Sequence, residues 1–251
     1  MMKAFLKKMP AFVLILAATG FARSAFATDY SLCFVSLPAE YSFYDSTSGP
    51  IGEQKAKSMG FDSVGLRVTQ SLNQNVGVFD LALEAGFGLP SGDQSFSRQD
   101  EVQFPPAGST KNDTNEGDYY EWKVTTIPLF LVMRVFQPAP QVGFAAQLGA
   151  GPMLVSVIEE DTESVFNAAG DLLLQTTQRR QFTAAAFATE MTGGITLQAS
   201  NEVTLRLMGG LIWISDIAEK TVRSAPSPLQ TSGISIGGIG YVVRAAISAG
   251  I

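Results

Sequence analysis

The 251-residue sequence contains no histidine and only one cysteine, Cys33. Without histidine, the chain has neither a Ser-His or Cys-His catalytic pair nor a histidine-ligated metal site. A single cysteine has no partner within the chain, which excludes a disulfide-stabilised scaffold. Charged residues make up only 16% of the chain and aromatic residues 10%, a balance that excludes an intrinsically disordered protein.

Positive charge is scarce as well, with 17 Lys and Arg against 23 Asp and Glu and a net charge of −6. We therefore expect no nucleic acid among the partners of this protein. Although 46% of the residues are hydrophobic, no run beyond the N-terminal segment approaches the roughly 20 residues of a transmembrane helix. Any membrane span in the rest of the chain would have to consist of strands.

The first 27 residues have the organisation of a secretory signal peptide. Lysines at positions 3, 7 and 8 precede an apolar run over 11–22, and Ala25-Phe26-Ala27 supplies a small-x-small cleavage pattern. The alternative, a membrane anchor, is less favoured because the run is short for a span. Cleavage after Ala27 also removes Arg23, so the net charge becomes −6 − 4 = −10 over 251 − 27 = 224 residues. We predict a signal peptide at 1–27 and one exported domain at 28–251.

The exported part is predicted to form eight strands with connections of alternating length. The predicted strands span residues 31–44, 61–72, 76–89, 119–136, 142–158, 179–199, 203–217 and 232–250. Short connections at 73–75, 137–141 and 200–202 alternate with long ones at 45–60, 90–118, 159–178 and 218–231. Short turns at one end and long loops at the other are typical of an up-and-down transmembrane barrel. For 159–178, a hairpin extension turning at Asn167–Asp171 is a second interpretation.

Each predicted strand alternates between an apolar face and a face of small or polar residues. In 142–158, for example, Phe144, Leu148 and Leu154 share one face, while Gly143 and Gln147 lie on the other. Glycine, Ala, Ser and Thr on the polar face suit the cramped interior of a small barrel. The apolar face, on which we also place Cys33, carries aromatic residues near both ends, as at a membrane interface: Tyr41, Phe43, Phe87, Tyr119, Trp213, Phe79 and Phe144. A soluble lipocalin-like barrel or sandwich is the alternative.

The same alternation places a balanced set of charged residues inside the barrel. This predicted interior charge network contains Glu40, Arg67, Asp80, Glu84, Arg134, Glu190, Arg206 and Arg244. Balanced partners lower the cost of desolvating charge, so one interpretation is a salt-bridged interior that closes the barrel. The other is a narrow channel with charged walls. An eight-stranded barrel is about filled by its own side chains, which favours closure.

The organisation resembles small outer-membrane barrels of the OmpA, OmpX and OmpW type. The resemblance lies in Thr125–Leu129, in Val142-Gly143-Phe144 running to Gly149–Pro152, and in Ala85–Gly88. The final residue departs from the pattern, because Ile251 replaces the usual Phe or Trp. The resemblance implies an all-β, eight-stranded antiparallel up-and-down barrel in the outer membrane. It also implies a monomer that contacts lipid and lipopolysaccharide and is inserted by the barrel-assembly machinery.

No catalytic or cofactor site is expected. Outer-membrane barrels that are enzymes use a catalytic histidine, which this chain lacks. Asp80 and Glu84 share a face but lie about 13 Å apart on a strand, too far for a catalytic carboxylate pair. We therefore predict a structural or surface-interaction role without a cofactor or metal. The alternatives are a narrow porin-like channel for small or amphipathic solutes and a secreted soluble binding protein.

Overall fold

A computed structural model gives the structure of the protein, in which every described element is a β-strand. It describes residues 28–45, 53–72, 79–91, 94–102, 114–137, 142–166, 171–200, 203–223 and 230–249. The strands are β1 (Thr28–Asp45), β2 (Glu53–Ser71), β3 (Phe79–Pro90), β4 (Gln94–Val102), β5 (Thr114–Gln137), β6 (Val142–Phe166), β7 (Leu172–Gln198), β8 (Val203–Arg223) and β9 (Gln230–Ala249).

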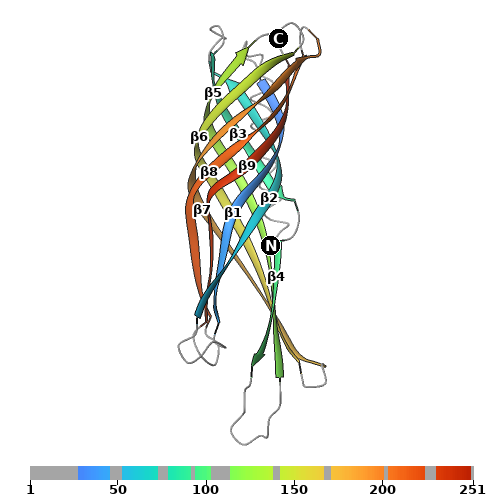
Figure 1. Ribbon diagram of the computed structural model, residues 1–251, viewed down its shortest axis with the longest axis vertical. Helices are drawn as coiled ribbons and strands as arrows, with labels where there is room; N and C mark the ends of the chain where they lie inside the picture. Colours follow the sequence, from blue (N-terminus) through green and yellow to red (C-terminus); the bar gives the residue numbers. More distant parts are fainter. Residues whose placement is uncertain are drawn as a thin grey trace, which may run out of the picture.

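The strands close into an eight-membered antiparallel ring (Figure 1). Neighbours follow the order β3-β2-β1-β9-β8-β7-β6-β5, and a further pairing of β3 with β5 completes the circle. The short β4 is not a ninth wall strand, because it continues the line of β3 and pairs with the outer part of β5. The predicted eight-stranded up-and-down barrel is confirmed.

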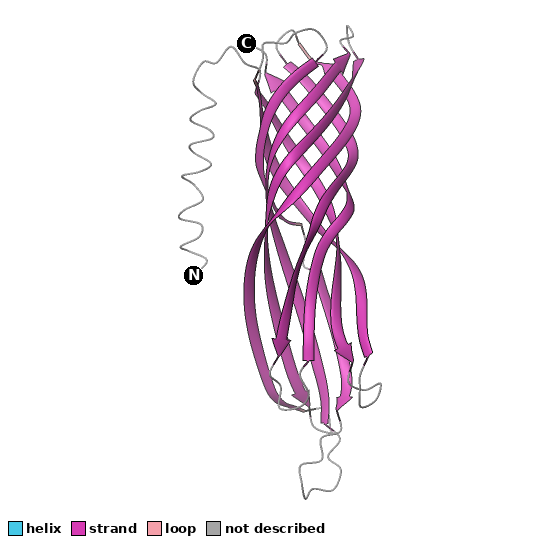
Figure 2. Cartoon of the chain, turned by 90° about the vertical axis from the view of Figure 1, so that its left-hand side faces the viewer, coloured by secondary structure: helices cyan, strands magenta, loops and turns pink. Residues whose placement is uncertain are grey.

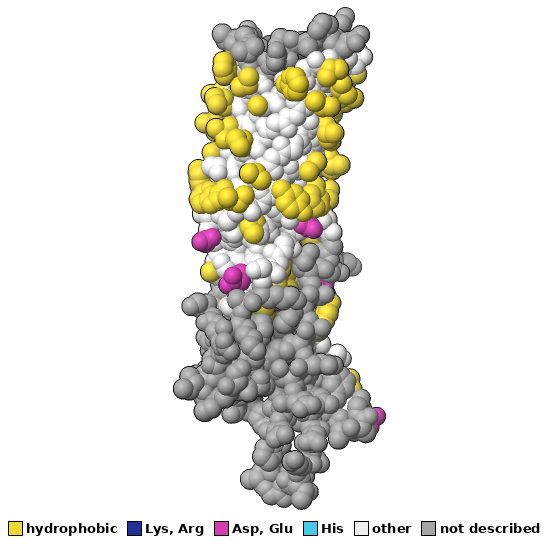
Figure 3. All heavy atoms as spheres, viewed as in Figure 1, with side chains coloured by type: hydrophobic (Ala, Val, Ile, Leu, Met, Phe, Trp, Pro, Cys, Tyr) yellow, Lys and Arg dark blue, Asp and Glu magenta, His cyan; other side chains and the backbone are white. Residues whose placement is uncertain are grey.

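A belt of exposed apolar side chains surrounds the half of the barrel that carries the short connections (Figure 3). On β6, Phe144 and Leu148 are exposed while Gln147 between them is buried, as alternation of side chains along a strand requires. Such a surface in water would far exceed the apolar patch of a soluble monomer. The belt is therefore the surface that meets lipid acyl chains, and the soluble alternatives do not account for it.

Beyond the belt, the wall of the barrel divides into two sheets. The ladder between β7 and β8 ends at Ala188–Ile214, and the ladder between β2 and β3 ends at Ser63–Pro90. From these points, β2-β1-β9-β8 form one sheet and β4-β5-β6-β7 form the other. Figure 2 shows the strands parting in this half of the molecule.

The space between these two sheets is filled by apolar side chains. Tyr41 of β1 and Trp122 of β5 meet across it with ring centroids 4.9 Å apart. Val157, Ile214 and Ile236 are buried in the same cluster. The outer half is therefore built like a soluble sandwich with an apolar interior. The interior within the belt contains both charged and apolar side chains, whereas the interior beyond it is mostly apolar.

The strands are longer than the sequence predicts. The segment 90–118, predicted as a loop, contains β4 and the start of β5. The second interpretation of 159–178 is confirmed, since β6 extends to Phe166 and β7 begins at Leu172. Hydrogen bonding between neighbouring strands extends them past the membrane boundary. The β-propensity of the residues alone does not show where such a strand ends.

The inward face of β1 is opposite to the predicted one. Cys33 and Tyr41, expected on the lipid face, are both 1% exposed in the interior. Glu40, expected inside, is exposed on the outer surface. A shift of one residue in phase moves every side chain of a strand to its other face. The prediction read Tyr41 as part of the aromatic girdle, whereas in the outer half it belongs to the apolar interior.

Two further observations concern other parts of the chain. Asp216 is exposed although Arg206, an even number of residues before it on β8, faces the interior, because the pairing of β8 with β9 shifts between Ile214 and Ile217. The predicted signal peptide, 1–27, lies outside the described residues. No helix in the described part of the chain is long and apolar enough to cross a bilayer.

Candidate functional site

A ring of four ion pairs lies in the barrel interior at the level of the belt. We call Arg67, Glu84, Glu190 and Arg244 the middle cluster. Arg67 Nη1 lies 2.9 Å from Glu84 Oε1 and 2.6 Å from Glu190 Oε2. Arg244 Nη1 lies 2.5 Å from Glu84 Oε2, and its Nη2 lies 2.6 Å from Glu190 Oε1. Each guanidinium therefore bridges both carboxylates, and the four charges sum to zero.

A second group, the end cluster, lies closer to the short connections and consists of Asp29, Asp80, Arg134 and Arg206. Arg134 donates from Nε to Asp80 Oδ2 at 2.7 Å and also pairs with Asp29. Arg206 Nη1 lies 2.5 Å from Asp29 Oδ2. Two acids again meet two bases, so this cluster is also neutral.

The ion pairs connect opposite walls of the barrel. Arg67 belongs to β2 and Glu190 to β7, and four steps around the eight-membered ring separate these strands in either direction. Both side chains are at most 4% exposed. A contact between diametrically opposed strands can form only if the side chains extend across the bore.

Neutral polar groups add hydrogen bonds to the acids Glu84 and Asp80 of the two clusters. Glu84 accepts from Thr69 Oγ1 at 2.8 Å and from Gln147 Nε2 at 3.3 Å. Ser71 Oγ donates to Asp80 Oδ1 at 2.5 Å. Satisfied lone pairs are what a buried ion pair needs to repay its desolvation, and these strands supply them from the polar face within the belt.

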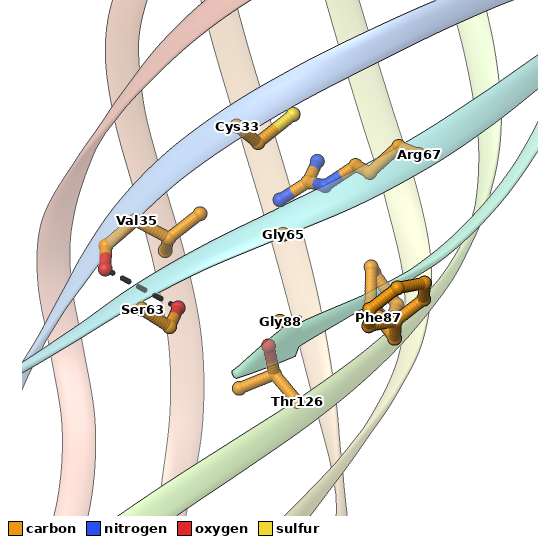
Figure 4. A pocket seen from close by; sticks show the side chains of 9 residues that line it. Cys33, Val35, Ser63, Gly65, Arg67, Phe87, Gly88 and Thr126 are labelled. Carbon is orange, nitrogen blue, oxygen red and sulfur yellow. Dashed lines mark hydrogen bonds between the residues drawn. The ribbon is translucent and has the colours of Figure 1, made fainter. Parts of the chain in front are cut away.

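Arg67 of the middle cluster also contacts an apolar side chain of the interior. Its guanidinium carbon lies 5.6 Å from the centre of the Phe130 ring, within the range of a cation–π contact. A cavity of about 10 Å³ lies beside it, bordered by Cys33, Ser63 and Thr126 among others (Figure 4). This volume suits a single water molecule, and Ser63 already donates to the Val35 carbonyl at 3.4 Å.

The structure brings together seven of the eight charged residues predicted for the interior. Arg67, Asp80, Glu84, Arg134, Glu190 and Arg244 are buried, and the Arg206 side chain is 11% exposed. Glu40 is the exception, and Asp29 takes its place as the fourth acid. The prediction missed Asp29 for two reasons. The predicted strand began at residue 31, and its phase placed the odd-numbered residues of this strand on the lipid face.

These side chains do not form a recognisable reaction centre. No group of three or more potential metal ligands occurs among the described residues. Every acid in the two clusters is held by arginine, which keeps its proton under all ordinary conditions and cannot act as an acid or a base. Cys33, with Sγ 3.6 Å from Ser31 Oγ, is buried. The arrangement suits cross-linking of the walls.

No family model matches the chain, and no curated protein matches its sequence. Neisserial surface protein A is 10% identical over 91% of this chain and 98% of its own, with a TM-score of 0.31. Ail of Yersinia pestis is 10% identical over 86% and 98%, with a TM-score of 0.26. The outer membrane protease OmpT of Escherichia coli is 8% identical over 92% and 99%, with a TM-score of 0.37.

Similarity at this level says nothing about activity, and the membrane assignment comes from the chain itself. In the described part of the wall, each strand of the closed ring pairs with a neighbour on both sides, as a membrane-spanning sheet requires. The belt supplies the apolar outer surface, and the ion pairs supply the polar interior. The chain is a small membrane-spanning β-barrel protein.

Proposed function

We propose that this protein is a non-conducting, non-enzymatic outer-membrane barrel that acts through the half projecting beyond the membrane. The contact between Arg67 and Glu190 carries this proposal, because it joins opposite walls at 2.6 Å in the middle of the bore. Any solute crossing the barrel would have to separate these charges in a site that holds little water. Breaking a buried pair costs about 3–5 kcal/mol.

The apolar interior of the outer half supports the same proposal. Val157, Ile214 and Ile236 are completely buried there. Ions and hydrophilic solutes would have to pass this layer before they met the ion pairs. Transfer of charge or unpaired polar groups into such surroundings is unfavourable.

The functional part of a closed barrel would then be the two sheets beyond the belt, whose strands are joined by the long connections. We infer a surface-interaction role for this half, with the membrane half as its anchor. In its own membrane the barrel is proposed to be a monomer in contact with lipid and lipopolysaccharide.

A swelling assay tests the closed state. Phosphatidylcholine vesicles containing the refolded protein are mixed with an isotonic solution of a small neutral sugar. We expect them to swell no faster than protein-free vesicles. Faster swelling would instead support the channel alternative.

A further inference from the structure

One strand of the outer half has a long unpaired edge. From Leu172 to Phe187, β7 pairs with β6 but has no strand on its other side among the described residues. The Phe187 N–H donates to Ser215 Oγ at 3.0 Å and marks the end of contact with β8. Because residues alternate along an antiparallel strand, the N–H and C=O groups of Gln175, Thr177 and the following odd-numbered residues face this open edge.

Little covers this edge. Residues 171–179 are all exposed, so both faces of the strand are open. The edge begins with three exposed leucines, Leu172, Leu173 and Leu174, at 52%, 59% and 60%. Leu174, the nearest of them to the belt, lies 13 residues from Phe187, or about 45 Å along the strand. Exposed edges normally invite pairing with another strand.

The sequence of the edge permits pairing with itself in the antiparallel direction. If Arg180 lies opposite its own copy, Leu174 faces Ala186, Gln175 faces Ala185 and Thr177 faces Thr183. The apolar ends therefore lie beside each other, and the polar residues meet at the centre.

Two arginines lie at the centre of this pairing and set its cost. Arg179 already pairs with Glu160 of β6 at 3.3 Å, and Arg180 lies opposite Glu159 in the same ladder. The charge of Arg179 is thus offset by an acid of its own hairpin, whereas Arg180 faces the partner's Arg180, and this like-charge contact opposes the pairing. Arg179 would face the partner's Gln181, whose amide oxygen accepts a hydrogen bond.

We propose that β7 pairs with β7 of a second copy of this chain, joining the two outer sheets edge to edge. This deepens the proposed surface role and rests on it. Antiparallel strands require the two barrels to point in opposite directions, so the partners sit in facing membranes. Two copies in the same membrane, related by a two-fold axis along the membrane normal, would place their β7 strands parallel with identical residues at the same height. A parallel ladder needs the two strands to be offset by one residue, so this arrangement cannot form the hydrogen bonds. The structure therefore favours adhesion between membranes.

Clustering of phosphatidylcholine vesicles that carry the protein, followed by light scattering, tests this proposal. We expect wild-type vesicles to cluster and Thr177→Pro to abolish clustering, because proline removes an edge N–H and blocks strand addition. Thr177→Ala is the matched control, since it loses the same contact with Thr162 Oγ1 but keeps the N–H. Clustering that persists in Thr177→Pro would overturn the proposal. Heat-modifiable gel mobility shows that each variant is folded.

Cross-linking fixes the direction of the pair. In a Cys33→Ser background, vesicles with Thr176→Cys are mixed with separate vesicles carrying Ala184→Cys and oxidised. Positions 176 and 184 face each other in the proposed register, so disulfide dimers should form only in the mixture. Absence of dimers, or equal dimers from Thr176→Cys alone, would contradict the antiparallel pair. Clustering and swelling are separate readouts, so vesicles that neither cluster nor swell reject this pairing without rejecting the closed barrel.

Discussion

Arg67 and Glu190 lie on opposite sides of an eight-stranded ring, and their side chains meet at 2.6 Å. Around them, Glu84 and Arg244 close a cycle in which every charge has two partners of opposite sign. Such a cycle holds the walls of the barrel at a fixed separation. It also makes each member dependent on the others, so removal of one charge leaves its neighbours buried and unbalanced.

Removal of Glu190 should therefore be costly. In Glu190→Ala, Arg67 and Arg244 share a single carboxylate, and we expect the free energy of unfolding to fall by about 3–5 kcal/mol. Urea unfolding in lipid vesicles, followed by tryptophan fluorescence, measures this change. Glu40→Ala is the matched control, because Glu40 is exposed on the outer surface. We expect a change within about 0.5 kcal/mol for this control, and similar losses in both variants would contradict the assignment.

Close approach of β7 and β8 should make neighbouring glycines respond differently to substitution. A Cβ at Gly210 would lie 1.9 Å from the Met191 carbonyl oxygen, whereas at Gly209 the nearest atom is 3.9 Å away. Gly210→Ala must displace backbone, and we expect a loss of about 1–3 kcal/mol. Gly209→Ala should cost much less in the same unfolding assay. Equal effects would show that the two strands do not approach so closely.

The two tryptophans should report on opposite sides of the wall. Trp213 is 43% exposed within the belt, while Trp122 is 1% exposed between the outer sheets. With Trp122→Phe, the remaining Trp213 should be strongly quenched by brominated phosphatidylcholine. With Trp213→Phe, the remaining Trp122 should be quenched weakly both by this lipid and by aqueous acrylamide. Strong lipid quenching of Trp122 would be incompatible with a sandwich in the outer half.

Cys33 should be inert in the folded protein. It is 1% exposed inside the barrel, whereas the side chain of Leu207 is 56% exposed on the belt. A membrane-soluble maleimide should label Leu207→Cys in a Cys33→Ser background and should leave wild-type Cys33 unmodified until urea is added. Mass spectrometry gives the extent of labelling. Rapid labelling of wild-type Cys33 in folded barrels would restore the original expectation that it faces lipid.

Outside β1, the faces of the strands in the membrane half could be predicted from sequence, because the alternation there has one constant meaning. On β5, for example, Leu131 and Met133 face outward and Arg134 inward, as the pattern of apolar and polar residues indicates. The same rule fails in the outer half, where an apolar residue such as Tyr41 points inward. Apolar and polar residues still alternate beyond this boundary, but there the apolar residues face the interior and the polar residues face water. The composition of the strands does not mark the position of this boundary.

The ion pairs themselves were predicted only as a set. Opposite charges on the interior face indicate that pairing occurs, but the choice of partner depends on strand stagger and on contacts across the bore. Nothing in the local sequence relates Arg67 to Glu190. Asp80 and Glu84, four residues apart on β3, enter different clusters.

Single-channel recording in a planar bilayer tests the central claim, that the barrel is closed. Wild-type protein inserted in a neutral membrane should give no steady unitary current, because the middle cluster and the apolar outer interior block the bore. Arg244→Ala removes one cation of the cycle, and Leu207→Ala on the lipid face serves as its control. Silent wild-type and control proteins would agree with this account. Steady unitary currents from wild-type protein that change in Arg244→Ala would contradict it and identify the cluster as the wall of a pore.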